Sequence, residues 1–282
     1  MPLENQPLFA DLELVKRIER CEARLLAAVV SGCGGDAFAV PVGSGYALFS
    51  GVDSPFTKLA GFGFEALELD ELRQLEQRYH TLGAPVQFEL ATLAAAELTN
   101  VLARRGYRLS GFENVLARPL AAALPPSPAP DFVVRHTKPS ELEAWIDVMV
   151  QASLQLAGSE TAAAHDSFDS ATLETAYRDM VRCSEVQCWT AERAGTIAGG
   201  AVMSIRDGVL QLGGAATHPK HRRRGIQRAL LAARLTEGRA LGCDMAVVAT
   251  QPGSQSQHNV QRCGFSLLYA RAIWQLHPQS RG

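Results

Sequence analysis

The stretch 212–230 constrains the fold of this 282-residue chain more than any other segment. An apolar run of small residues, 212–217, leads to Pro219, and a basic turn containing Gly225 follows. Apolar residues then recur at helical spacing from Ile226 onward. This order is typical of a strand, a tight turn and a helix N-terminus. Such a corner can bind a phosphate, because free backbone N–H groups and the positive end of the helix dipole meet there.

The turn resembles the acyl-CoA-binding motif of the GCN5-related N-acetyltransferases (GNAT). That motif reads Arg or Gln, two residues, Gly, one residue, then Gly or Ala. Arg222 and Gly225 match it, and Pro219 stands at its usual place six residues before the glycine, but the last small position is Gln227. The resemblance implies that pyrophosphate binds the backbone N–H groups of the turn, with charge-assisted bonds from its arginines. The residues so implied are Arg222, Arg223, Arg224, Gly225, Ile226, Gln227 and Arg228.

The resemblance also implies where the rest of the acyl-CoA lies. In the GNAT fold two neighbouring strands splay apart, and the pantetheine arm pairs with the backbone of the earlier strand. This places the pairing at Ala215, Ala216 and Thr217, where one N–H group would face the thioester oxygen as an oxyanion donor. The implied acyl donor is acetyl-CoA and the implied acceptor is an amine, with no metal ion.

The order of expected elements over 132–276 is that of the same mixed α/β fold. The expected strands are 132–135, 186–192, 196–205, 209–217, 245–250 and 267–276, and the expected helices are 140–154, 170–182, 226–241 and a short one before Cys263. A second motif, Gly264-Phe265, follows the last expected helix, where the family commonly has Gly-Phe. Two motifs in the right order strengthen the resemblance.

The catalytic residues are less clear from the sequence. Many family members place a tyrosine as general acid four residues before the glycine of Gly-Phe, and Val260 stands there. The remaining candidates are His258 and Tyr269 as acids, and Glu192 as the base that accepts the amine proton. Each has an alternative interpretation: His258 as a helix-end residue, Tyr269 as a core residue, and Glu192 as a solvated strand-edge charge.

The chain is long enough for two domains. Four prolines within 125–130 indicate a linker, so the expected division is 1–120, a linker at 121–131, and 132–282. The first part shows weak sequence similarity to the second, since Leu59–Phe64 resembles 212–217 and 103–109 resembles 261–267.

We interpret the first part as a degenerate copy of the same fold, with an unrelated α/β cap domain as the alternative. In place of the basic turn, 65–70 carries three acids and no glycine, so we predict that this copy binds no CoA.

Composition excludes several classes of protein. The net charge of −2 argues against nucleic acid as a partner, and no apolar run reaches the eighteen residues of a membrane span. The N-terminus lacks the pattern of a signal peptide, and the six cysteines form no Cys-x-x-Cys pair, which favours the cytoplasm and argues against a zinc site. The oligomeric state stays open, with a homodimer among the alternatives.

Three functions remain under comparison. The first is a CoA-dependent N-acyltransferase, transferring acetyl to a primary amine of a small molecule or peptide. The second is a non-catalytic acyl-CoA sensor or regulatory protein, which the absent tyrosine and the degenerate copy would suit. The third is a module binding another nucleotide phosphate, which Gly264-Phe265 disfavours. The acceptor is not identified, because its pocket would be built from variable loops, among them 154–170 and the turn at Asp207.

Overall fold

The structure, a computed structural model, describes residues 8–122, 131–157 and 168–278 and divides into two compact units. The C-terminal unit consists mainly of Val115–Leu268, and the N-terminal unit of Ala10–Asn114 with the chain from Tyr269 onward. This division differs from the expected domain boundaries, because two long strands, β5 (Arg108–Pro119) and β11 (Ser266–Leu276), are each shared between the units. Most of the expected linker, and the loop 158–167 of the expected acceptor pocket, lie outside the described residues.

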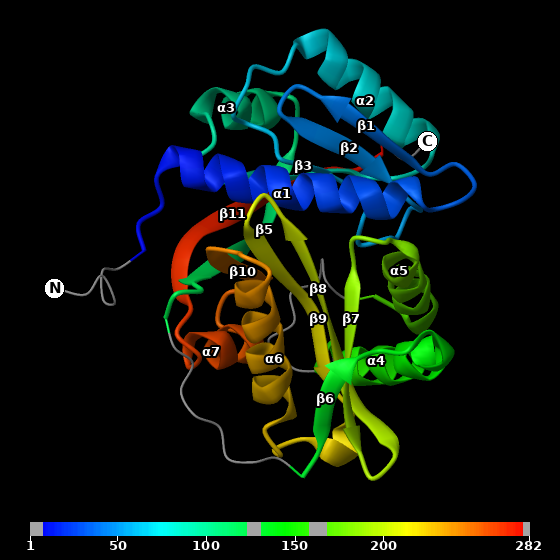
Figure 1. The fold of residues 1–282 in the computed structure, drawn as a ribbon. Coiled ribbons are helices and arrows are strands. Elements are labelled where there is room, and N and C mark those ends of the chain that lie inside the picture. The colour runs from blue at the N-terminus through cyan, green and yellow to red at the C-terminus, as the bar shows by residue number, and fades with distance from the viewer. Residues whose placement is uncertain (1–7, 123–130, 158–167, 279–282) are drawn as a thin grey trace, which may run out of the picture. The chain divides into compact units, whose positions relative to one another are not determined.

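The C-terminal unit is built on a mixed sheet whose strands follow the order β6-β7-β8-β9-β10-β5. The strands are β6 (Val133–His136), β7 (Gln187–Arg193), β8 (Thr196–Arg206), β9 (Val209–Thr217) and β10 (Met245–Thr250). From β6 to β9 the pairing is antiparallel, whereas β9 and β10 are parallel. A parallel pair needs a crossover connection, and helix α6 (Ile226–Ala240) supplies it (Figure 1).

Two hydrophobic clusters lie against this sheet. One combines sheet residues with α6, through Leu230, Leu231 and Leu235. The other combines sheet residues with α4 (Leu142–Ala157) and α5 (Ser170–Arg182), around Trp145 and Tyr177. A short helix, α7 (Gln255–Gln261), follows β10. The expected helix 170–182 and strand 209–217 coincide with α5 and β9, and the mixed α/β fold predicted from the sequence is confirmed.

The N-terminal unit repeats this succession with the order β1-β2-β3-β4-β11-β5. Its elements are α1 (Leu12–Ser31), β1 (Phe38–Val42), β2 (Gly45–Phe49), β3 (Lys58–Ala60), α2 (Leu69–Thr81), β4 (Val86–Ala91) and α3 (Ala96–Arg104). An antiparallel meander, β1 to β3, leads through α2 to the parallel strand β4, as β7 to β9 lead through α6 to β10. The predicted internal repeat is therefore present, although α1 has no counterpart among the elements expected from the sequence.

Candidate active site

Strands β9 and β10 are paired along only part of their length. The register joins Val209–Leu212 of β9 to Met245–Val248 of β10. Beyond it, Gly213, Gly214 and Ala215 are exposed although they lie in a central strand. Gly214 has φ +46°, and the pairing of β9 with β8 shifts register in the same region. Of the residues 215–217 where the resemblance places the pantetheine arm, Ala215 lies in this exposed segment, whereas Ala216 and Thr217 are buried.

Two buried hydroxyls lie at the ends of these strands. Thr217 ends β9 and is 7% exposed, and Thr250 ends β10 and is 5% exposed. Neither hydroxyl has a hydrogen-bond partner within the described part of the chain. Buried polar groups are nearly always hydrogen-bonded, so these two are available to a ligand that enters between the strands.

The turn before α6 leaves its backbone donors open. Gly225 is the N-cap at φ +80°, and no side chain caps the helix. The first intrahelical bond runs from Ala229 N to Gly225 O, at 3.0 Å, so the N–H groups of 226–228 have no acceptor within the helix. Arg223 has φ +62°, a conformation that costs a non-glycine residue about 1–2 kcal/mol. Arg223 and Gly225, on either side of Arg224, both have left-handed backbone conformations. Successive backbone N–H groups in such a segment can form a concavity that binds an anion.

The charge at this turn is strongly positive. Residues 218–228 contain five lysines and arginines and no acid, in a chain whose net charge is −2. Burial, and then the neighbouring His218 and Arg193, lower the pKa of His221 below its ordinary value. Cations are unfavourable at the positive end of a helix dipole, so an anion bound here would relieve a repulsion that the free protein carries.

The side chain of Gln227 is fixed by a hydrogen bond to α7. Its Oε1 accepts a hydrogen bond of 3.0 Å from Nδ2 of Asn259, on α7. A Cβ added to Gly225 would meet no atom within 4 Å. The departure from the family motif at Gln227 therefore leaves the space in front of Gly225 open, and the residues present fit a pyrophosphate.

The three expected catalytic side chains lie in different surroundings. Glu192, in β7, accepts a 2.6 Å hydrogen bond from Nη2 of Arg135, which also bonds Glu141. His258, in α7, is exposed, and its Nδ1 lies 3.4 Å from the amide nitrogen of Gln255.

Tyr269 belongs to the N-terminal unit and is 4% exposed. Its hydroxyl donates a 2.6 Å hydrogen bond to Oε1 of Glu19. Burial and the charge of Glu19 raise the pKa of Tyr269 well above its ordinary value. Its surroundings are those of a buried core residue.

One residue that the sequence did not indicate lies against the opening. A Cβ added to Gly214 would be 3.6 Å from Cε1 of Tyr177, on α5. The Tyr177 hydroxyl is 3.0 Å from Oγ of Ser153, on α4, and burial raises its pKa. In the sequence Tyr177 is simply one apolar-face residue of an amphipathic helix, so no local signal could have identified it.

The corresponding region of the N-terminal unit is closed. Gly61, Phe62 and Gly63 are buried, and the Phe62 ring packs edge-on against Phe88 with 5.3 Å between centroids. A Cβ on Gly63 would come within 2.5 Å of the Ala94 Cβ. Where Gly213–Ala215 form an opening, the first copy fills the space with its own side chains.

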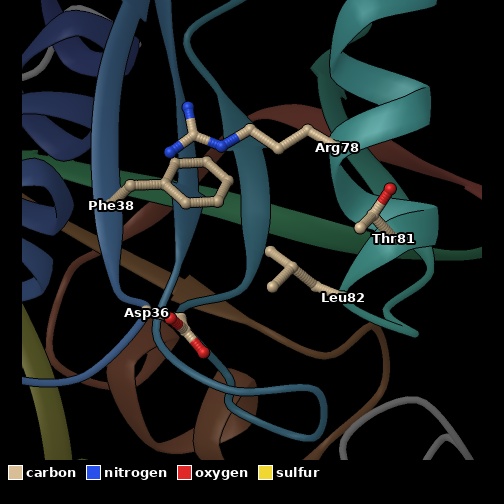
Figure 2. Close-up of a pocket in the computed structure, with 5 residues that line it drawn as sticks. All are labelled: Asp36, Phe38, Arg78, Thr81 and Leu82. Carbon is tan, nitrogen blue, oxygen red and sulfur yellow. The ribbon is translucent and has the colours of Figure 1, made fainter.

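A surface hollow of about 320 Å³ lies elsewhere in the N-terminal unit, lined by Asp36, Phe38, Arg78, Thr81 and Leu82. The Arg78 guanidinium lies over the Phe38 ring, 3.5 Å from its centroid (Figure 2). This stacking occupies the Arg78 guanidinium, and the Thr81 hydroxyl donates a 2.8 Å hydrogen bond to Gln77 O, so we assign the hollow no chemistry.

Neither a metal site nor a membrane-spanning helix is found among residues 8–122, 131–157 and 168–278. Among the described residues, no group of three or more His, Cys, Asp or Glu side chains could hold a metal ion. In the same part of the chain, no helix is long and apolar enough to cross a membrane.

A basic helix N-terminus beside a pair of separated parallel strands forms a candidate phosphate-binding site in a mixed α/β fold. Residues 155–265 match the sequence profile of the "Acetyltransferase (GNAT) family". The C-terminal region of this chain is therefore a GNAT domain, and the N-terminal unit repeats its succession of elements.

Solved structures agree with this assignment at the level of fold. A GCN5-related N-acetyltransferase from Kribbella flavida is 20% identical with a TM-score of 0.65, and the match covers 96% of this chain and 98% of that one. A tandem GNAT protein from the clavulanic acid biosynthesis pathway is 13% identical with a TM-score of 0.57, covering 98% of both chains. No curated protein matches the sequence.

Proposed function

We propose that the protein is an acetyl-CoA-dependent N-acetyltransferase that acts on a primary amine of a small molecule or peptide. One observation carries the proposal: the uncapped, basic start of α6 lies at the end of the same strand, β9, whose residues Gly213–Ala215 are open. Membership of the GNAT superfamily supports acyl-CoA-dependent acetyl transfer in general. That the acceptor is a primary amine is part of the proposal and goes beyond what the family match supports.

The proposed roles follow from the geometry. The N–H groups from Arg223 to Arg228 bind the pyrophosphate, and the side chains of Arg222, Arg223 and Arg224, all exposed, surround it. The pantetheine arm pairs with Ala215–Thr217, beyond the last β9–β10 pair. An N–H group of this segment donates to the thioester oxygen, which becomes an oxyanion as the amine attacks.

In the proposed reaction the amine nitrogen attacks the thioester carbon. The C–N bond forms, the C–S bond breaks, and the electron pair of that bond leaves on sulfur. The amine gives up one proton, and the CoA thiolate can gain one. Because a thiol has a pKa of about 8.5, the thiolate leaves near neutral pH without a dedicated acid, which is compatible with Val260 at the usual tyrosine position.

Tyr269 is committed to Glu19, so of the two expected acids we propose His258 as the group that protonates the CoA thiolate after it has left. Glu192 is bound to Arg135, and we propose that water removes the amine proton in its place. We further propose that the N-terminal unit binds no CoA, because Phe62 fills the equivalent opening and acids replace the basic turn.

A second function, an acyl-CoA sensor without turnover, is favoured by one observation, the ion pair that occupies Glu192. Incubation with acetyl-CoA and a panel of amines, with release of free CoA thiol followed over time, separates the two. Acetyl transfer to at least one amine, identified by mass spectrometry, is the result expected. Tight binding of acetyl-CoA with no release above background would establish the sensor, and no binding would refute both.

A further inference from the structure

Arg234, on α6, is a buried cation without a counter-ion. It is 3% exposed, and within the described residues no carboxylate pairs with it. Arg271 in the N-terminal unit shows the contrast, since it is 1% exposed and ion-paired with three glutamates. Burying an unpaired charge is costly, so a guanidinium in this position needs compensation from another source.

The compensation comes from main-chain carbonyl groups. Nη1 of Arg234 donates to Val202 O in β8 at 2.8 Å and to Gly213 O in β9 at 3.3 Å. Its Nε donates to Leu230 O, one turn earlier in α6, at 3.1 Å. Burial lowers the pKa of Arg234 to about 9, so the side chain still carries its charge at neutral pH.

The two strand carbonyls belong to the place where β9 departs from regular pairing. Val202 and Gly213 are register partners immediately beside the shift between β8 and β9. Gly214 follows with φ +46°, within the exposed segment Gly213–Ala215 of the proposed cleft. Arg234 therefore holds β8 and β9 from α6 at the point where their register shifts. Its positive charge strengthens these hydrogen bonds.

The anchor has a consequence for the next N–H group. The peptide between Gly213 and Gly214 is planar, so fixing its carbonyl oxygen fixes the whole unit. The orientation of the Ala215 N–H relative to this unit then depends only on the φ and ψ angles of Gly214. We propose that Arg234 is a positioning residue that holds β9 so that the Ala215 N–H faces the thioester oxygen of acetyl-CoA. This role rests on the proposed acetyltransferase function.

The test compares Arg234→Met and Arg234→Lys with a matched control, Arg118→Met. Arg118 is also buried in the C-terminal unit and also donates to main-chain carbonyls, Cys263 O and Ala122 O, both at 2.8 Å. Four quantities are measured: amide hydrogen exchange of 213–216 in the free protein, the Kd of acetyl-CoA, and the kcat and KM for an amine that the wild type acetylates.

In Arg234→Met we expect faster exchange of 213–216, a Kd for acetyl-CoA within about threefold of wild type, and a kcat lower by about 10- to 100-fold. Losing a single oxyanion donor outright costs about 10²–10³ in kcat, so a donor that is only misplaced should cost less. Arg234→Lys should recover part of kcat, because its ammonium group keeps the positive charge. The recovery should be incomplete, because the lysine side chain is shorter and reaches fewer of the carbonyl groups. Arg118→Met should lower the midpoint of unfolding and leave kcat and the exchange of 213–216 unchanged.

Unchanged exchange at 213–216 in Arg234→Met would overturn the proposal whatever the activity. A kcat that falls no further than in Arg118→Met would overturn it as well. If the wild type itself binds no acetyl-CoA, the proposed function fails first and the positioning role falls with it. That outcome is distinguishable because it appears before any variant is made.

Discussion

Gly225→Glu tests the phosphate turn, and Gly242→Glu is its matched control at the other end of α6. Both glycines have φ +80°, and a Cβ added to either meets no atom within 4 Å. Each substitution therefore carries a similar backbone cost, about 1–2 kcal/mol for a left-handed non-glycine residue. The two variants differ in where the new carboxylate lies, beside the proposed pyrophosphate or beyond the far end of the helix.

The magnitude follows from the charges. A carboxylate about 4 Å from one phosphate charge costs ~1 kcal/mol in water and ~4 kcal/mol at an effective dielectric constant of ~20. Since Gly225 is exposed, the lower half of that range applies to each charge, and a pyrophosphate carries more than one. We expect the affinity of Gly225→Glu for acetyl-CoA to fall by about 30-fold or more, at ~1.4 kcal/mol per tenfold change. Gly242→Glu should bind as the wild type does.

Stability should follow the opposite order. A negative charge is favourable at a helix N-terminus and unfavourable at the C-terminus, by about 0.3–1 kcal/mol each. Gly225→Glu should thus be the more stable variant while being the one that loses acetyl-CoA. Isothermal titration calorimetry measures the affinity, and urea unfolding measures the stability. Equal affinities of the two variants would refute the placement of the phosphate site at Gly225.

Three further predictions concern single side chains. Arg271→Met should lower the free energy of unfolding of the N-terminal unit by about 3–5 kcal/mol, because Glu19 is left buried without its cation, and a loss under ~1 kcal/mol in urea unfolding would contradict this. Burial raises the pKa of the Cys188 thiol to about 11, so less of it is thiolate at pH 8 than in a free cysteine, and iodoacetamide should label it about 100-fold more slowly, with a rate that rises as pH approaches 11. Labelling of Cys188 at the rate of a free cysteine would show that its thiol is accessible to solvent and would contradict the raised pKa. Glu192→Gln should leave kcat within about threefold, since its carboxylate serves Arg135, whereas a loss above 100-fold with an altered pH profile would make Glu192 the catalytic base.

The sequence was informative wherever the signal was local. The helix at 170–182 and the strand at 209–217 follow from periodicity and from turn residues, and both occur where they are expected. The basic turn before α6 could be proposed as a phosphate site because proline, glycine and clustered arginine each have a direct backbone or charge effect. By contrast, the hairpin β1–β2 and helix α1 were not among the expected elements.

The amino-acid sequence by itself predicted the class of fold and the basic turn at 222–228, because periodicity and turn residues are local signals, and it left the first part as either a degenerate copy or an unrelated cap domain. Only the tertiary structure decided which copy is open, through Phe62 buried in one and Gly213–Ala215 exposed in the other. It also decided that Tyr269 bonds to Glu19, 250 positions away, and that Arg234 reaches a carbonyl 32 positions away. Burial and partners across such distances are set by strand pairing and helix packing, which no local pattern encodes.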